Sequence, residues 1–241
     1  MNKLTLLSVF FISFMGASHA KAQTADEIVN KWVNAMGGHD KLKSIQTVYT
    51  ENDVTIMNNP ATNTTWLADG KGYKSVTDFS GQKIIDCYIK DGGWSVNPLA
   101  GQPAPASMPG QQVKMGQLQL EAGGPLLDYA SRGGKVELQG KDSVNGAPAY
   151  KIKLTTKDGM EVSYFISNSS FYIVREVIKM KADGQDFEIS WIKSDYRKTP
   201  EGFIMPYATE LTIPGVTINF AVKKIEINKA LDAGVFDMPK S

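Results

Sequence analysis

Short turn signals recur along most of this chain, and the runs between them alternate between apolar and polar residues. Two-residue Asn-Gly and Asp-Gly turns join neighbouring antiparallel strands. The clearest alternation is found in 160–167 and 216–222. We therefore expect about eleven or twelve antiparallel strands, and a meander of this length has to curl or close on itself. The turn signals lie at 69–72, 80–82, 91–93, 145–146, 158–159, 168–170, 183–184, 200–202 and 214–215.

One helix is expected before the first strand, over residues 25–36, because apolar residues recur there at helical spacing. Thr24 or Asp26 can cap its start. Gly37 and Gly38 follow the last apolar position, where helices commonly end on a left-handed residue. A phosphate-binding glycine loop would instead follow a strand and open a helix. We therefore interpret the glycine pair as a stop signal, followed by one more helical turn.

The middle of the chain interrupts the strand pattern. Residues 97–112 are proline-rich and predict a loop, and 112–123 and 124–134 predict two short helices, the second with Pro125 at its first position. A helical insertion halfway through a curled sheet is expected to lie across an open mouth or face of the sheet. We expect it to form a lid there, together with helix 25–36. The apolar side of the insertion is formed by Leu118, Leu126, Leu127 and Tyr129.

The first residues have the pattern of a secretory signal peptide. Lys3 precedes an apolar run over 4–15, and small residues fit cleavage after Ala20 or, as we favour, after Ala22. The apolar run is too short to span a bilayer. No cysteine lies near the cleavage site, so no lipid anchor is expected there. The prediction is a signal peptide over 1–22 and one exported, soluble domain over 23–241.

Charge and cysteine content exclude several classes of protein. The chain has 26 Lys and Arg and 25 Asp and Glu; removing Lys3 and Lys21 leaves 24 against 25, a net charge of −1. Without basic clusters, no nucleic-acid partner is expected.

The single cysteine, Cys87, cannot form an intramolecular disulfide, so the core alone must hold the fold together. Cys87 alternates with Ile85 and Ile89 and is expected to be a small buried hydrophobe.

Catalytic motifs are absent from the sequence. His39 is the only histidine after the signal peptide, and we expect it to be exposed in a helical turn. There is no HExxH, CxxC or GxSxG pattern, so we expect no metal, no cofactor and no catalytic residues. Asp86 and Asp91 could form a carboxylate pair, but nothing distinguishes them from the other acidic residues. A hydrolase is therefore the least favoured function.

The number of apolar and aromatic strand positions is the informative feature. They could simply fill a barrel core. A wide barrel, however, has more inward positions than a compact core needs and leaves room for a ligand. Without convergent polar groups, that ligand should be largely apolar. The residues expected to line the cavity are Val54, Ile56, Trp66, Ile85, Trp94, Leu118, Leu126, Leu127, Tyr164, Trp191 and Phe220.

Several segments resemble a known family. They are ADEIVNKWVNAMGGHDKLKSIQTV, GGWSVNPLAGQPAPASM, the stretch from GGPLLDYASRGG to LTTKDG, and INKALDAGVFDMP. Over residues 25–239 the chain is similar to the periplasmic outer-membrane lipoprotein-sorting proteins, the LolA/LolB-like family. The resemblance implies an incomplete antiparallel β-barrel of about eleven strands, with short helices covering an apolar cavity. Members of the family hold the acyl chains of lipoproteins while these cross the periplasm.

The resemblance also implies partners. Lipoproteins or lipids would bind through their acyl chains to a periplasmic monomer, with an inner-membrane exporter and an outer-membrane acceptor as further partners. Well-studied carriers close their lid with an arginine of an early strand, whereas the first arginine here is Arg132. That latch is therefore not carried over. The alternative function is an envelope-stress sensor or signalling domain of the same fold that binds a protein partner.

Overall fold

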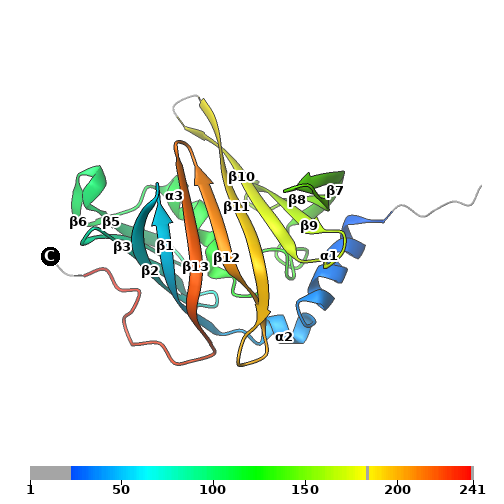
Figure 1. Ribbon diagram of the computed structural model, residues 1–241, viewed down its shortest axis with the longest axis horizontal. Coiled ribbons are helices and arrows are strands. Elements are labelled where there is room, and N and C mark those ends of the chain that lie inside the picture. Colours follow the sequence, from blue (N-terminus) through cyan, green and yellow to red (C-terminus); the bar gives the residue numbers. More distant parts are fainter. Residues whose placement is uncertain (1–22, 183–184, 240–241) are drawn as a thin grey trace, which may run out of the picture.

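The computed structural model describes residues 23–182 and 185–239, so the predicted signal peptide and the predicted turn at 183–184 lie outside it. One antiparallel sheet of thirteen strands dominates the described chain (Figure 1). Its strand order is β6-β5-β4-β3-β2-β1-β13-β12-β11-β10-β9-β8-β7. The strands are β1 (Thr47–Ile56), β2 (Asn59–Ala68), β3 (Gly72–Phe79), β4 (Gln82–Ile89), β5 (Gly92–Asn97), β6 (Gln102–Ser107), β7 (Lys135–Val144), β8 (Ala147–Thr155), β9 (Glu161–Ser167), β10 (Ile173–Ala182), β11 (Gln185–Lys198), β12 (Ile204–Ile213) and β13 (Val216–Ile227).

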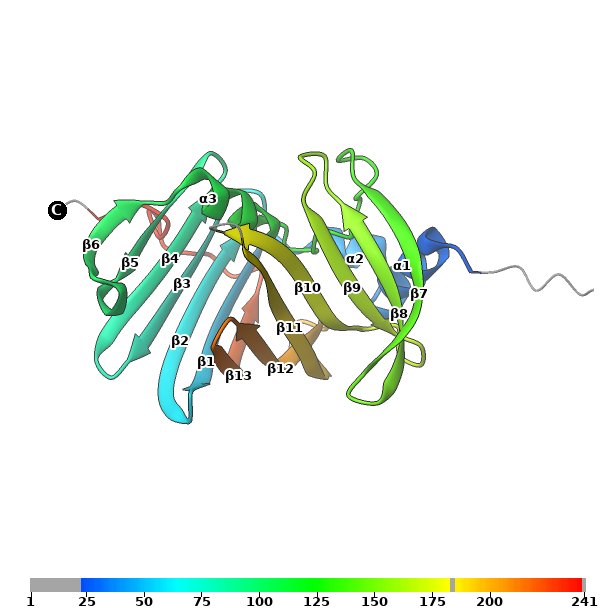
Figure 2. The ribbon, with the colours of Figure 1, turned by 90° about the horizontal axis from the view of Figure 1, so that it is seen from above.

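The sheet curls strongly but does not close (Figure 2). β6 and β7 are its two edges, because each pairs with one neighbour only. The predicted turns within the described residues all join consecutive strands. The turn between β1 and β2 was not predicted; Met57 and Asn58 both adopt left-handed backbone there, with φ of 48° and 66°. The predicted fold class, an incomplete antiparallel barrel with short helices, is confirmed.

The N-terminal helices agree with the sequence. α1 spans Ala25–Ala35, and Thr24 and Glu27 form a reciprocal capping box at its start. Gly37 and Gly38 adopt φ of 110° and 97°, and α2 (His39–Lys43) follows directly. The interpretation of the glycine pair as a helix stop is confirmed. None of the helices in the described chain is long and apolar enough to cross a membrane.

The central insertion differs from the prediction in three places. The proline-rich segment contains a short 3-10 turn (Pro98–Ala100) and then β6, whose two prolines are tolerated because the strand lies at an edge of the sheet. α3 (Gly110–Gln117) and a 3-10 turn (Leu118–Leu120) replace the first predicted helix. The second predicted helix is wrong, since residues 121–134 form a series of turns. Gly124 and Asp128 adopt φ of 84° and 55°, which a right-handed helix cannot contain.

The two faces of the sheet are covered by different parts of the chain. On β4, the Tyr88 ring lies against Gly116 of α3, whereas the neighbouring Cys87 packs with Phe236 of the C-terminal segment. Successive strand residues point to opposite faces. We call the face of Tyr88 the inner face and the face of Cys87 the outer face. Cross-strand pairing extends both faces over the whole sheet.

The main core lies at the β7–β10 end of the inner face. α1, α2 and the turns that follow α3 pack there against β8, β9 and β10. The side chains with no exposed surface include those of Ile28, Ile152 and Ile166. α1 contributes a complete apolar stripe to this core and therefore belongs to it.

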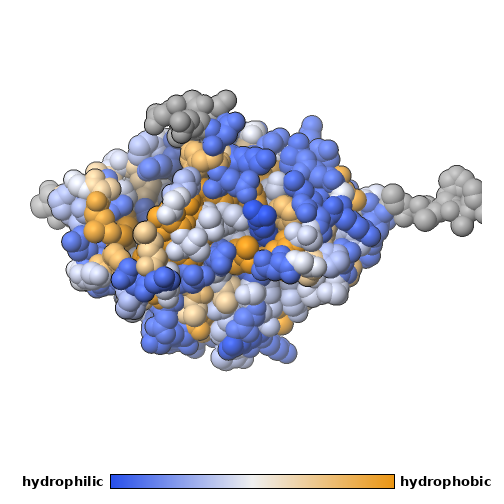
Figure 3. Space-filling view, turned by 45° about the horizontal axis from the view of Figure 1, so that its top comes forward, coloured by the Kyte–Doolittle hydropathy of each residue, from blue (hydrophilic) through white to orange (hydrophobic). Residues whose placement is uncertain are grey.

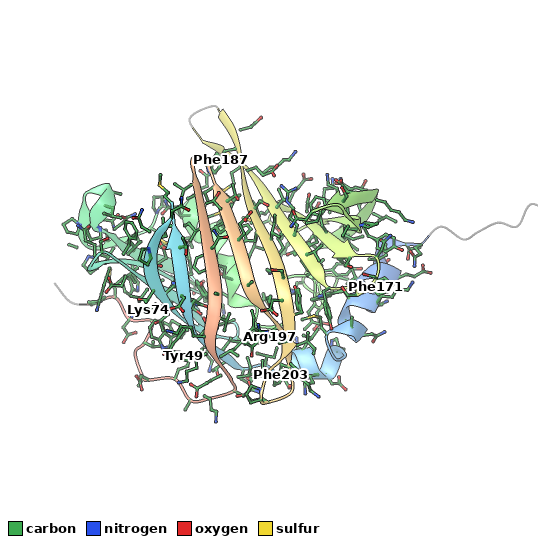
Figure 4. All side chains as sticks on the ribbon, viewed as in Figure 1. Tyr49, Lys74, Phe171, Phe187, Arg197 and Phe203 are labelled. Carbon is green, nitrogen blue, oxygen red and sulfur yellow. The ribbon has the colours of Figure 1, made fainter. Side chains whose placement is uncertain are left out.

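The C-terminal segment, residues 228–239, covers part of the outer face. The Phe236 carbonyl accepts hydrogen bonds from Trp94 Nε1 (2.9 Å) and Cys87 Sγ (3.4 Å). Lys74 Nζ donates to the Val235 carbonyl over 3.0 Å, as its position beside this segment in Figure 4 illustrates. Cys87 has no exposed surface, so its predicted burial is confirmed, and burial raises the pKa of its thiol to about 11.

Replacing Phe236 with alanine is expected to release this segment and make Cys87 reactive. The half-buried ring should contribute about 2 kcal/mol of stability, less than a fully buried phenylalanine. A thiol reagent such as Ellman's reagent should label Cys87 of the variant quickly and the native protein slowly. Met238→Ala is the control, because Met238 lies in the same segment and is 46% exposed. Equal labelling rates in all three proteins would contradict the covering role.

Candidate ligand-binding cavity

A cavity of about 510 Å³ lies between α3, the turns that follow it, strands β8 and β10, and the turn that joins β8 to β9. This volume is typical of sites for small organic ligands. Charged groups, among them Lys114 and Arg132, also border the space. Figure 3 views the molecule with the top of Figure 1 turned forward. It shows hydrophobic side chains near the middle of the visible face, with hydrophilic ones around them. The apolar lining comes from Met115, Leu118, Pro125, Leu154, Met160, Ile178 and Met180.

α3 bridges the two halves of the inner face (Figure 2). Its Val113 packs with Tyr73, Tyr88 and Met108 of the β3–β6 half. Met115 and Leu118, displaced around the helix axis, line the cavity instead. Gly116 is the only buried residue of α3, and its missing side chain lets the helix lie on the Tyr88 ring. A hydrogen bond from Gln117 Nε2 to the Ile89 carbonyl (2.9 Å) also joins α3 to β4.

We call the turns over residues 121–134 the central loop. Hydrogen bonds and an ion pair of Arg132 hold its backbone in place. Arg132 pairs with the Glu121 carboxylate and donates to the Leu127 carbonyl and, over 2.8 Å, to the Pro125 carbonyl. These contacts lie within the loop itself. The first arginine of the chain therefore shapes the loop on one side of the cavity.

Three further contacts join the central loop to the N-terminal helices. Asp128 accepts from His39 Nε2 (2.8 Å) and Lys43 Nζ (2.9 Å) of α2, and Tyr129 donates to Asp26 of α1. The hydrogen bond to Asp128 raises the pKa of His39, and Lys43 and His39 together lower the pKa of Asp128. His39 is exposed, as predicted, but it is engaged in this contact.

A second, smaller cavity of about 130 Å³ lies beneath the central loop. Leu126, Tyr164 and Trp32 line it, together with an ion pair between Glu176 and Lys193 whose nitrogen and oxygen are 2.6 Å apart. The inner face is thus not uniformly apolar. Neither cavity contains the constellation of a metalloenzyme, and no group of three His, Cys, Asp or Glu in the described residues could hold a metal ion.

Most of the residues predicted to line a cavity lie on the inner side of the sheet. Leu118 lines the larger cavity, and Leu126 lines the smaller one. Leu127 is 4% exposed and belongs to the main core. The remaining residues of this group lie on the inner face by their strand register: Val54, Ile56, Tyr164, Trp191 and Phe220.

Trp66, Ile85 and Trp94 were assigned to the wrong face. Trp94 pairs across the strands with Cys87 and hydrogen-bonds the C-terminal segment, and Ile85 belongs to the same outer cluster. Trp66 reaches that face too, where Lys74 Nζ lies 5.7 Å from its ring centroid and 5.4 Å from that of Trp94. A shift of one residue along a strand exchanges the two faces, and here both faces are covered.

Sequence reasoning missed the methionines and isoleucine that line the larger cavity. Met160 begins a predicted strand and Ile178 and Met180 alternate along β10, so the period-two pattern was available. The alternation does not indicate at which end of the sheet the insertion lies. That end is decided by the contacts of the central loop with α1 and α2.

Comparison with known proteins identifies the fold. No protein-family model matches the chain, and its sequence matches no curated protein. A DUF1329 family protein from Desulfovibrio piger ATCC 29098 superposes with a TM-score of 0.60 at 14% identity, covering 90% of this chain and 98% of that one. The LolA superfamily protein NE2245 from Nitrosomonas europaea gives 0.57 at 12% identity, covering 89% and 98%.

A third solved structure is similar over most of its length. A putative outer membrane lipoprotein-sorting protein domain from Vibrio parahaemolyticus gives a TM-score of 0.52 at 11% identity, covering 88% of this chain and 95% of that domain. At these identities the likeness concerns the fold. The chain is therefore LolA-like in its fold, and the resemblance that its sequence motifs predicted is confirmed at this level.

Proposed function

We propose that this protein is a carrier that holds the apolar part of a lipid-modified protein or a related amphiphile in the cavity beneath α3. The observation that carries the proposal is the space of about 510 Å³ between a LolA-like sheet and α3, a helix with a single buried residue. Its lining is rich in methionine and aliphatic side chains, which adapt to flexible apolar ligands.

The energetics of such a carrier depend on exchange with a membrane. Removing an acyl chain from water gains about 0.8 kcal/mol per methylene, whereas a membrane offers the chain an equally apolar environment. A carrier therefore needs a water-excluding cavity and an element whose movement favours uptake or release. α3 fits this role, because it buries one residue only and spans the space between the two halves of the sheet.

The cellular location and the partners of this carrier rest on the sequence and are also part of the proposal. The signal peptide would direct the protein to the periplasm, where the mature monomer over residues 23–241 would act without a cofactor and without catalysing a reaction. An inner-membrane exporter would supply its cargo and an outer-membrane acceptor would receive it. In the alternative function, a sensor domain, the same fold would bind a protein partner and carry no lipid.

Replacing Leu118 with aspartate tests the carrier proposal. Leu118 is half-buried in the cavity wall, so a carboxylate there should be tolerated by the fold and should oppose an apolar chain. We expect affinity for a fluorescent fatty acid such as dansyl-undecanoate to fall about tenfold, which corresponds to roughly 1.4 kcal/mol. The measurement is fluorescence titration of the purified mature protein.

Leu99→Asp is the matched control, because Leu99 is 56% exposed in the turn between β5 and β6. It should bind the probe as the native protein does. Native mass spectrometry of protein isolated from its own cells should also show a bound lipid or acylated protein. Absence of probe binding, together with an unloaded mass, would contradict the carrier and favour the sensor.

A further inference from the structure

A continuous row of polar side chains crosses the inner face from β1 to β5. Thr50 pairs with Thr65, Thr65 with Ser75, Ser75 with Asp86, and Asp86 with Ser95. All five are half-buried. Five consecutive strands thus present a polar residue at the same level of a face that would be apolar if it only packed a core.

Four of the five residues in this row, all except Asp86, form hydrogen bonds with one another or with neighbouring residues. The hydroxyls of Thr50 and Thr65 lie 2.6 Å apart, Ser75 Oγ accepts from Asn63 over 2.8 Å, and Ser95 Oγ accepts from Gln102 over 3.1 Å. Among the described residues, no side chain donates a hydrogen bond to Asp86 or forms an ion pair with it. Burial alone raises the pKa of this carboxyl group.

A half-buried carboxylate without a donor is unfavourable, and such a group in a native protein calls for an explanation. The partner that suits it best is a charged donor, since hydrogen bonds to ionised groups are the strongest. A primary ammonium has three N–H donors. Asp86 would accept one of them, and the hydroxyl oxygens of its cross-strand neighbours Ser75 and Ser95 can accept the others.

The position of Asp86 relative to the apolar surface is also informative. The row adjoins the Tyr73–Tyr88 pair, whose ring centroids are 6.4 Å apart and on which α3 rests. Beyond β1 the inner face carries large apolar side chains, among them Phe220 on β13 and Leu211 on β12. α3 lies between the Tyr73–Tyr88 pair and the larger cavity.

We propose that Asp86 binds a primary ammonium group, so that the preferred ligand is an amphiphile with an amine head at β4 and an apolar chain toward β10. This assignment rests on the proposed carrier function and adds the chemical class of the head group. It gives the polar row a role that packing does not require.

Three probes of equal chain length separate the head from the chain: dodecylamine, dodecanol and dodecanoate. Each is used at pH 7 to displace dansyl-undecanoate from the mature protein. We expect the native protein to bind dodecylamine about tenfold more tightly than dodecanol, and dodecanoate most weakly. Asp86→Asn, which keeps the side-chain shape, should remove the preference for the amine and leave the affinity for dodecanol unchanged.

Asp53→Asn is the matched control. Asp53 lies on the outer face of β1, is exposed and pairs with Lys223, so this change alters the net charge equally but on the opposite face of the sheet. It should keep the amine preference. A preference that survives in Asp86→Asn, or is absent from the native protein while dodecanol still binds, would overturn the ammonium site alone. Failure of all three probes to displace the dye would overturn the carrier function as well.

Discussion

Replacing Leu126 with aspartate is expected to lower the free energy of unfolding by roughly 4 kcal/mol, because the change removes a buried aliphatic side chain and buries a charge. Leu126 is 1% exposed and belongs to the same core cluster as Trp32 and Ile152. The central loop that carries it is tied to α1 and α2 by Tyr129 and Asp128. Urea unfolding followed by tryptophan fluorescence measures the loss.

This result would separate a structural loop from a mobile lid. If the central loop opened to admit ligand, Leu126→Asp would abolish dye binding and leave the stability nearly unchanged. Leu99→Asp, an exposed leucine changed in the same way, should alter neither property. A stable Leu126→Asp protein that cannot bind the dye would therefore assign the lid to the central loop and not to α3.

Replacing Gly116 with alanine is expected to destabilise the protein by about 2 kcal/mol and to weaken dye binding. Alanine normally stabilises a helix interior relative to glycine by about 1 kcal/mol. Here the added Cβ would overlap the ring of Tyr88, so α3 must lift away from the sheet. Thermal unfolding and dye titration of the variant measure both effects.

Two further proteins make this test specific. Gly110 begins α3 and has no atom within 4 Å of where its Cβ would lie, so Gly110→Ala should be neutral or slightly stabilising. In a Tyr88→Ala background, Gly116→Ala should cost much less than in the native protein, since the overlap is gone. Equal costs in both backgrounds would show that α3 does not rest on the Tyr88 ring.

Together the two variants assign different roles to the segments on either side of the larger cavity. The central loop is part of the core and keeps its place through Arg132, Asp128 and Tyr129. α3 buries only Gly116, and its contacts with the sheet include the packing of Val113 and a hydrogen bond from Gln117 to the Ile89 carbonyl. Movement of α3 alone could expose Met115 and Leu118 without disturbing the core.

The local elements of the fold could be predicted because short-range chemistry determines them. Thr24 caps α1, Gly37 ends it, and the Asn-Gly and Asp-Gly turns join strands where they were expected. The same local reasoning failed over residues 124–134. Pro125 and the apolar Leu126, Leu127 and Tyr129 favoured a helix there, but Gly124 and Asp128 have left-handed backbone. The Gly124 carbonyl accepts from Arg132, and Asp128 accepts from His39.

The candidate site could be predicted only in part. Alternation correctly separated the two sides of each strand, and Tyr164 and Phe220 lie on the inner face as expected. It could not say which side of β4 is the inner one, since Cys87 and Tyr88 are both buried, one under Phe236 and the other under α3. Trp94 was misplaced for this reason.

The sequence by itself determined α1 and its ends, most of the hairpin turns and the antiparallel sheet that cannot lie flat, because each depends on residues within a few positions of one another. Only the tertiary structure decided which face encloses the cavity, since the C-terminal segment and α3 come from distant parts of the chain and cover opposite sides of the same strands. The tertiary structure also decided on which face Asp86 lies. The role proposed for Asp86 depends on this, because that role involves its cross-strand neighbours Ser75 and Ser95.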